Sequence, residues 1–220
     1  MTVQVKICGL TRPEDAAAVL SAGADFAGLV FHPRSARHLR PDQAGAIAQH
    51  LRGRVGIVAL LVDPVDDALV EIIGAVKPDW IQLHGRETPR RVAEVRARFA
   101  TRVIKALGIS DQTDLQQIAG QERVADMLLF DVKPSAGDTA GGNGRAFDWK
   151  LLRGLTVRKP WLLAGGLNAG NVAAAIRSAN APGVDVSSGV ETAPGIKDAD
   201  AIRAFVTHVR NDAAAKESPS

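Results

Sequence analysis

The sequence predicts an α/β protein, a single-domain (β/α)8 TIM barrel. Eight short apolar stretches alternate with eight helix-forming ones at about 27 residues a unit, and no second composition regime interrupts the 220 residues. Alternating strands and helices imply parallel strands joined by right-handed crossovers, and eight such units close most naturally into a barrel. An open doubly wound sheet is the alternative, but no Gly-x-Gly-x-x-Gly follows the first strand.

The expected strands are apolar runs. The run at 55–62 is apolar almost throughout, as expected for a strand covered on both faces. In the first strand, alternation places Gln4, Lys6 and Cys8 on one face and apolar side chains on the other. We expect strands at 3–8, 25–31, 55–62, 80–84, 102–107, 124–131, 161–164 and 184–187.

Local signals mark the starts of several helices. Thr11 is expected to cap the first helix, with Pro13 just inside it, and Pro41 opens the second. Asp148 is expected to cap a brief helix after a glycine-rich loop at 133–146. We expect helices at 13–21, 41–51, 65–76, 89–99, 111–119, 148–153, 169–178 and 198–209. The barrel would then occupy residues 1–210, and the small polar residues of 211–220 would form a flexible tail.

Composition and charge argue against several classes of protein. A net charge of +3 from dispersed basic residues gives no reason to expect nucleic-acid binding, although it could help to attract an anionic substrate. No apolar run reaches the roughly 18 residues of a membrane helix, and we expect no signal peptide. The single cysteine and the lack of a His and Cys cluster predict neither disulfides nor a metal site, which fits a cytoplasmic protein.

Polar side chains close several of the expected strands, at the end of a barrel where active sites lie. Cys8 ends the first strand, His84 the fourth and Asp131 the sixth. A thiolate can take a proton from carbon and a carboxylic acid can donate one, so Cys8 and Asp131 are candidates for base and acid. Cys8 could instead be a small buried hydrophobe, and Asp131 could pair with Lys105 or Lys133. We assign no catalytic role to His84.

Two basic side chains could assist this chemistry. An unassisted thiol has a pKa of about 8.5, and Lys6, on the same strand face as Cys8, could increase its thiolate fraction. Arg37 follows the second strand, and its guanidinium fork suits a carboxylate. Arg34, in the same loop, is expected to be a solvated surface residue.

Glycine-rich turns close the last two strands, at 164–167 and 187–190. Such turns expose backbone N–H groups, and barrels of this class often bind a phosphate between them. Each turn alone could simply be a tight turn with a C-cap. From the residues alone, the sequence therefore predicts a phosphate-binding barrel enzyme with acid–base groups.

The motifs at the strand ends closely resemble those of the phosphoribosylanthranilate isomerase family of tryptophan biosynthesis. Seven stretches carry the resemblance, in order along the chain: 6–15 (KICGLTRPED), 28–37 (GLVFHPRSAR), 82–85 (QLHG), 129–133 (LFDVK), 141–149 (GGNGRAFDW), 164–172 (AGGLNAGNV) and 184–191 (VDVSSGVE). The resemblance implies a (β/α)8 barrel that catalyses an Amadori rearrangement. N-(5-phosphoribosyl)anthranilate becomes 1-(2-carboxyphenylamino)-1-deoxyribulose 5-phosphate.

The resemblance also implies roles for individual residues. Asp131 matches the general acid that opens the ribose ring, Cys8 the general base that removes the C2 proton, and Arg37 the group that holds the anthranilate carboxylate. No metal or organic cofactor is implied, because the substrate nitrogen acts as the electron sink. One position departs from the pattern, since Asn143 stands where Thr or Ser is usual. The phosphate loops of the family correspond here to Gly166, Ser187, Ser188 and Gly189.

Two other barrel enzymes and a non-catalytic barrel are the alternatives to the isomerase. Indole-3-glycerol phosphate synthase shares a phosphate-binding barrel but relies on lysine acids, and a dual-substrate isomerase would be expected to use paired aspartates rather than Cys8. A silent barrel that binds phosphorylated metabolites is disfavoured by the retention of both Cys8 and Asp131. We expect a small phosphorylated substrate as the partner, no nucleic acid or membrane partner, a monomer or homodimer, and a cytoplasmic location.

Overall fold

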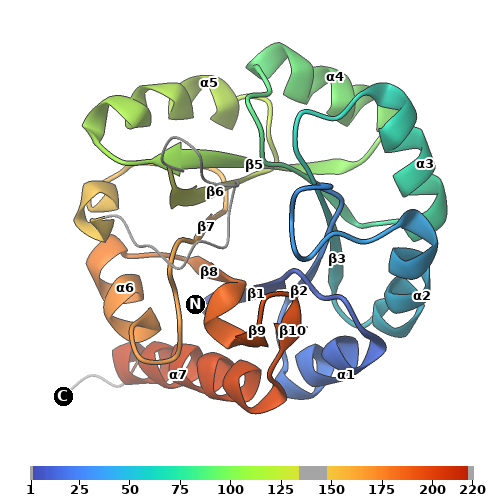
Figure 1. Ribbon diagram of the computed structural model, residues 1–220. Coiled ribbons are helices and arrows are strands. Elements are labelled where there is room, and N and C mark those ends of the chain that lie inside the picture. The colour runs from blue at the N-terminus through green and yellow to red at the C-terminus, as the bar shows by residue number, and fades with distance from the viewer. Residues whose placement is uncertain (1, 134–147, 218–220) are drawn as a thin grey trace.

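The chain folds into a closed barrel of parallel strands inside a ring of helices, as Figure 1 shows along the barrel axis. The computed structural model describes residues 2–133 and 148–217, with side chains up to residue 211. The strands follow in chain order, and β1 pairs with β8 to close the barrel, with Lys6 opposite Asp185. The predicted (β/α)8 barrel is confirmed. Its strands are β1 (Gln4–Cys8), β2 (Phe26–Val30), β3 (Gly56–Leu61), β4 (Trp80–Leu83), β5 (Arg102–Ile109), β6 (Met127–Val132), β7 (Trp161–Leu163) and β8 (Gly183–Val186).

The α-helices cover the outside of this barrel, and short 3-10 turns lie in the connections. The helices that follow β2 and β4 have the predicted bounds. The α-helices are α1 (Pro13–Ala22), α2 (Pro41–Leu51), α3 (Asp66–Val76), α4 (Pro89–Phe99), α5 (Ile118–Glu122), α6 (Val172–Ala179) and α7 (Ala199–Glu217). The 3-10 turns are η1 (Gln112–Gln117), η2 (Trp149–Leu152) and η3 (Ser188–Val190).

The first helix begins one residue later than the predicted cap. Arg12, not Thr11, stands at the N-cap with an extended backbone, because Pro13 occupies the first helical position. The Asp15 carboxylate accepts hydrogen bonds from the backbone N–H groups of Thr11 and Arg12, at 2.9 and 3.1 Å. The predicted Thr11 cap is therefore wrong, and a carboxylate in the first turn satisfies these donors instead.

Between β5 and β6 the chain forms η1 followed by α5, where one α-helix at 111–119 was predicted. Side chains bond the local backbone here: Asp111 accepts from the N–H of Thr113 at 2.8 Å, and Asp114 accepts from that of Ser110 at 2.8 Å. Such local bonds favour tight turns over a regular helix. Asp148 does cap its turn as predicted, accepting from the N–H of Lys150 at 3.0 Å.

The two C-terminal helices also differ from their predicted bounds. α6 begins at Val172 rather than at 169, because Asn168 and Asn171 bond nearby backbone N–H groups before the helix starts. α7 runs to Glu217, past the predicted end at 209 and through most of the segment predicted as a tail. The glycine-rich loop predicted at 133–146, with Asn143, lies outside the described residues except for Lys133.

The core has two layers. A large layer between strands and helices includes Val5 and Ile7, the apolar face of β1. The barrel interior holds a second apolar layer, which includes Phe26, Trp80 and Met127. Cys8 packs with Val30 and Leu60 in a separate cluster inside the barrel. The two faces predicted for the first strand are therefore confirmed, and Cys8 lies on the inner one.

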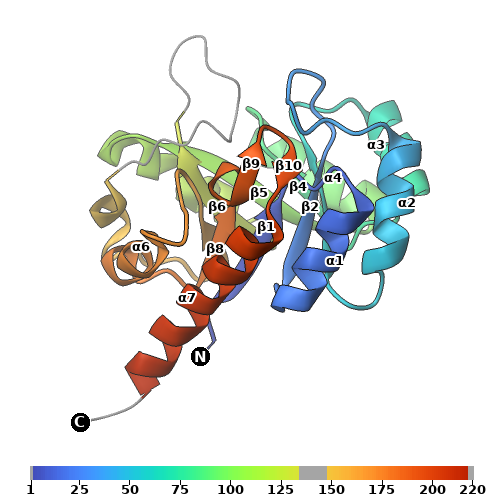
Figure 2. The same ribbon diagram turned by 60° about the horizontal axis from the view of Figure 1, so that its bottom comes forward.

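A small antiparallel hairpin, β9 (Glu191–Ala193) and β10 (Ile196–Lys197), follows β8 and was not predicted. Figure 2 shows this hairpin above the end of β1, at the edge of the barrel from which the long helix α7 descends. The hairpin thus lies at the carboxyl ends of the strands, where the polar residues of the sequence gather.

Candidate active site

A larger and a smaller cavity, both lined by described residues, open at the carboxyl ends of the strands. The larger has a volume of about 840 Å³ and lies over β3 to β6. The smaller, of about 50 Å³, lies over Cys8. Both are lined by His84 and Asp131, so the cavities meet at these two side chains. The smaller cavity is lined by Cys8, Val30, His32, Ser35, Arg37, Leu60, His84, Asp131, Asp185 and Ser187. The structure therefore brings Cys8, Asp131, Arg37 and Ser187 together.

Cys8 is a buried free thiol beside a buried ion pair. Lys6 Nζ lies 2.9 Å from Asp185 Oδ1. A β-carbon placed on Gly28 would lie 2.9 Å from Cys8 Sγ and 3.3 Å from Lys6 Nζ, so glycine leaves room for both groups. Burial raises the pKa of the Cys8 thiol, Lys6 lowers it, and Asp185 raises it; the pKa is raised overall. Lys6 acts in the predicted direction, but burial outweighs it.

Lys6 keeps its charge inside the barrel. Burial lowers its pKa, but the negative charges of Asp185 and Cys8 raise it by more, to about 12. Lys6 therefore supplies a fixed positive charge beside the thiol, which favours the thiolate.

Asp131 lies one residue before the end of β6 and faces His84 rather than a lysine. Its Oδ2 lies 3.4 Å from His84 Nε2, and its Oδ1 accepts a hydrogen bond from the N–H of Val132 at 2.7 Å. The predicted alternative partners are occupied elsewhere: Lys105 pairs with Glu87 and Lys133 with Asp114, each at 2.6 Å. Neither lysine therefore explains why a carboxylate stands at this strand end.

His84 links Asp131 to the barrel interior. The His84 Nδ1 atom lies 2.9 Å from Nε2 of Gln82. The Gln82 side chain is fully buried. With the Gln82 amide placed in this way, Nδ1 accepts the hydrogen bond, and the proton of a neutral ring lies on Nε2, the nitrogen that faces Asp131. The bond to Gln82 thus holds His84 beside Asp131, with Nε2 at 3.4 Å from its carboxylate.

Arg37 reaches from the loop after β2 toward the end of β8. Its Nε and Nη2 donate to Oε1 and Oε2 of Glu191, both at 2.7 Å. A β-carbon on Gly9 would lie 2.4 Å from Arg37 Cδ and 3.2 Å from Ser187 Oγ, and Gly9 has a φ of +82°. Glycine at position 9 therefore lets Arg37 cross the end of β1, next to Cys8. Arg34 is exposed at the rim of the larger cavity.

The glycine-rich turns after β7 and β8 pack directly against each other. A β-carbon on Gly189 would lie 1.9 Å from the carbonyl oxygen of Leu167, closer than any real contact. Gly165 and Gly166 have positive φ values of 87° and 64°, and Asn171 Nδ2 donates to the carbonyl of Gly166 at 2.9 Å. Ser187, Ser188, Gly189 and Gly166 are each partly exposed. The four residues predicted to bind phosphate thus lie on two turns in contact.

Sequence reasoning missed Glu191 and Lys197. Both side chains are almost fully buried, and their charged ends lie 2.7 Å apart. Glu191 follows Ser187 by four residues and could have been noted as an acidic residue next to a predicted ligand turn. Lys197 had no such signal, because only the hairpin brings it back over the end of β8.

Two absences apply to the described part of the chain. Within residues 2–133 and 148–217, no group of three or more His, Cys, Asp or Glu side chains could hold a metal ion. In the same residues, no helix is both long enough and apolar enough to span a membrane.

The sequence matches the family model for N-(5'phosphoribosyl)anthranilate (PRA) isomerase over residues 5–208. It is 53% identical to the N-(5'-phosphoribosyl)anthranilate isomerase of Paracoccus denitrificans over 94% of this chain and 96% of that protein. It is 51% identical to that of Azorhizobium caulinodans over 96% and 92% of the two chains. The chain belongs to the phosphoribosylanthranilate isomerase family. The predicted family is therefore confirmed.

Solved structures of phosphoribosylanthranilate isomerases share the fold of this chain. The enzyme of Thermotoga maritima is 34% identical, with a TM-score of 0.86 over 96% of this chain and 100% of that one. A structure described as phosphoribosyl anthranilate isomerase with reduced 1-(o-carboxyphenylamino)-1-deoxyribulose 5-phosphate has a TM-score of 0.84, at 34% identity and the same coverage. These likenesses support the barrel and the family.

Proposed function

We propose that this chain catalyses the Amadori rearrangement of its family in the cavity between Cys8 and Asp131. The substrate is N-(5-phosphoribosyl)anthranilate and the product is 1-(2-carboxyphenylamino)-1-deoxyribulose 5-phosphate, a step of tryptophan biosynthesis. The observation that carries the proposal is the single cavity lined by Cys8, Asp131, Arg37 and Ser187. A thiol, a carboxyl group and an anion-binding guanidinium line the same space.

Asp131 is the proposed general acid. In its protonated form it gives a proton to the ribose ring oxygen, the C1–O bond breaks, and the nitrogen lone pair forms a Schiff base at C1. The rigid neighbours of Asp131, His84 and the N–H of Val132, hold its carboxyl group at the point where the two cavities meet.

Cys8 is the proposed general base. Its thiolate removes the proton from C2 of the Schiff base, and the electrons move to the nitrogen. The resulting enolamine takes up a proton at C1 and loses the proton of its C2 hydroxyl to give the ketone. Lys6 supports this role because its positive charge favours the thiolate form. The substrate nitrogen accepts the electrons, so the scheme uses no cofactor.

The two charged groups of the substrate have separate proposed partners. Arg37 is the proposed partner of the anthranilate carboxylate, because a guanidinium can bind two carboxylate oxygens. The turns that contain Gly166, Ser187, Ser188 and Gly189 are the proposed phosphate site. The partner is then one small phosphorylated molecule, handled in the cytoplasm by a monomer or homodimer.

The decisive test is an assay with substrate made in situ. Phosphoribosylanthranilate is generated from anthranilate and phosphoribosyl pyrophosphate, and the loss of its fluorescence is followed with and without the protein. We expect a large acceleration. No acceleration by the wild-type chain would overturn the isomerase assignment and would favour a barrel that only binds phosphorylated metabolites.

A further inference from the structure

Glu191 holds one edge of the Arg37 guanidinium. Both of its oxygens accept hydrogen bonds from Arg37, from Nε and from Nη2, at 2.7 Å. Only 4% of the Glu191 side chain and 12% of the Arg37 side chain are exposed, so water does not compete strongly for this pair. The two parallel bonds fix the plane of the guanidinium as well as its position.

Lys197 holds Glu191 in turn. Its Nζ lies 2.7 Å from Glu191 Oε1, 3.1 Å from the carbonyl oxygen of Ser187 and 3.4 Å from Ser187 Oγ. Three acceptors match the three donors of an ammonium group. Burial lowers the pKa of Lys197, and the charge of Glu191 offsets part of this effect. Lys197 therefore connects the carboxylate that orients Arg37 with the first residue of the turn after β8.

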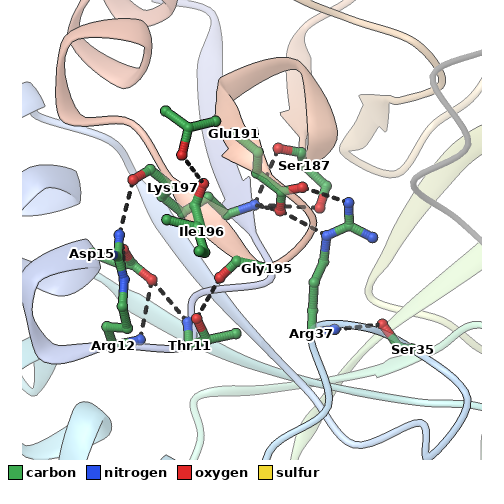
Figure 3. Close-up of polar contacts among 11 residues, drawn as sticks. Thr11, Arg12, Asp15, Ser35, Arg37, Ser187, Glu191, Gly195, Ile196 and Lys197 are labelled. Carbon is green, nitrogen blue, oxygen red and sulfur yellow. Dashed lines mark hydrogen bonds and ion pairs between the residues drawn. The ribbon is translucent and has the colours of Figure 1, made fainter.

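The hairpin that carries Glu191 and Lys197 is fixed from outside, as Figure 3 shows. Arg12 Nη2 donates to the carbonyl of Lys197 at 2.9 Å, and the Thr11 hydroxyl donates to the carbonyl of Gly195. A β-carbon on Gly195 would lie 2.8 Å from the carbonyl oxygen of Ala36, next to Arg37. The loops after β1 and β2 therefore clamp the hairpin in one position.

Glu191 leaves part of the Arg37 guanidinium open. A guanidinium has five N–H donors, and the bonds to Glu191 use one on Nε and one on Nη2. The second N–H of Nη2 and one N–H of Nη1 form the open edge, and Figure 3 shows the remaining terminal nitrogen directed away from Glu191. Arg37 itself lines the small cavity with Cys8 and Asp131.

We propose that Glu191, braced by Lys197, is a positioning residue that presents the open edge of Arg37 to the carboxylate of the substrate. Two basic side chains share one carboxylate, so an anion on the open edge would balance the charge of the cluster. Lys197 also couples this subsite to the phosphate side of the site through Ser187. The inference rests on the proposed function, and it adds Glu191 and Lys197 to the residues that determine specificity.

The test compares two ligands that differ only in the carboxylate. One is reduced 1-(o-carboxyphenylamino)-1-deoxyribulose 5-phosphate, and the other is its phenylamino counterpart without the carboxylate. Calorimetry measures the Kd of each for the wild type, Glu191→Gln and Glu191→Asp. We expect Glu191→Gln to weaken binding of the carboxylated ligand about tenfold or more and to leave the other nearly unchanged, because only the first uses Arg37. Glu191→Asp, which keeps the charge, should restore part of the affinity.

The matched control is Asp200→Asn, which also removes a carboxylate partner of an arginine, Arg203, but on the exposed surface of α7. It should change neither Kd. A loss of affinity of the same size for both ligands in Glu191→Gln would mean a general structural role and would overturn the positioning role. Unchanged binding of both ligands would overturn it as well. If Glu191→Gln does not fold, Glu191→Asp takes its place in the comparison. Thermal unfolding checks that this variant is folded.

Lys197→Met tests the coupling to the phosphate side. Because Lys197 also binds the Ser187 carbonyl, we expect this variant to weaken the binding of both ligands, with the larger loss of affinity for the carboxylated one. An effect confined to one ligand would overturn the coupling. Failure of the proposed function has a separate signature: the wild type would neither isomerise phosphoribosylanthranilate nor bind either ligand, and the inference would fail with it.

Discussion

Lys6 Nζ lies 2.9 Å from Asp185 Oδ1. Lys6 precedes Cys8 by two residues, and both side chains lie on the inner face of β1. The ion pair places one positive and one negative charge beside the thiol, and the two act on its pKa in opposite directions. Because burial adds to the effect of Asp185, the pKa of Cys8 is raised overall. Substitution of Lys6 or Asp185 should therefore change the pKa of Cys8, the proposed base.

The first prediction concerns the pH dependence of Cys8. The thiolate is the reactive form, so a raised pKa moves the rise of reactivity to a pH above that of a free thiol, whose pKa is about 8.5. Asp185→Asn removes a negative charge that raises the pKa and should move the rise to lower pH. Iodoacetamide alkylation of the lone cysteine, followed by mass between about pH 7 and about pH 10, measures both midpoints. A wild-type midpoint below that of a free thiol, or no shift in the variant, would contradict the prediction.

The second prediction separates catalysis from binding. Cys8→Ser and Asp131→Asn keep the shape of the site but replace the proposed base and acid. We expect each to lower kcat by a factor of about 100 to 10,000, while the Kd of the reduced product analogue stays close to that of the wild type. Full activity in Cys8→Ser would move the base to another residue.

Arg37→Ala should affect substrate binding more than catalysis in the same assay. It removes the proposed carboxylate partner without touching the proposed acid or base. We expect a raised KM and a weaker Kd for the carboxylated analogue, with a smaller change in kcat. A loss confined to kcat would contradict the role given to Arg37.

The sequence predicts those parts of the site whose positions follow from the pattern and order of the strands. Cys8 and Asp131 each end an apolar run, and in a parallel barrel all such ends meet on one side. The contact between the turns that hold Gly166 and Gly189 follows in the same way, from the adjacency of the last two strands. These positions depend only on alternation and chain order, which a single sequence carries.

The partners of these residues could not be predicted in this way. The Glu191 and Lys197 pair depends on a hairpin whose strands have only three and two residues, too few for an apolar alternation to reveal it. The pairing of Lys6 with Asp185 depends on the register in which β1 closes against β8. The balance of burial against charge at Cys8 likewise requires the packed structure, because both terms vary with distance.

The third prediction concerns the contact of the two glycine-rich turns. A side chain at position 189 would collide with the backbone carbonyl of Leu167 at 1.9 Å, so Gly189→Ala must push the turns apart. We expect a loss of about 1 to 3 kcal/mol in the free energy of unfolding and weaker binding of the reduced product analogue through its phosphate. Urea unfolding and calorimetry measure the two effects.

The control for this variant is Gly74→Ala, in helix α3, where a β-carbon meets no atom within 4 Å. Alanine favours a helix over glycine, so this change should raise the free energy of unfolding by up to about 1 kcal/mol. It should leave ligand binding unchanged. Equal behaviour of the two glycine variants would contradict the proposed contact of the turns.

The last prediction concerns a buried ion pair under the larger cavity. Lys105 Nζ lies 2.6 Å from Glu87 Oε2, and only 2% of each side chain is exposed. Glu87 also accepts hydrogen bonds from the backbone N–H groups of Asp63 and Gly85, at 2.8 to 3.1 Å, and so fixes the loop next to His84. Glu87→Gln would replace one of these acceptor oxygens by an N–H₂ group, which faces either the backbone donors or Lys105, and would leave Lys105 charged and buried.

We expect Glu87→Gln to lower the free energy of unfolding by about 3 kcal/mol or more, because removal of one partner leaves an uncompensated buried charge. Glu94→Gln is the matched control, since it breaks the Arg90–Glu94 pair on the exposed surface of α4. That change should cost less than about 0.5 kcal/mol, as exposed ion pairs contribute little. Urea unfolding of both variants measures the difference, and equal effects would contradict the buried character of the Glu87–Lys105 pair.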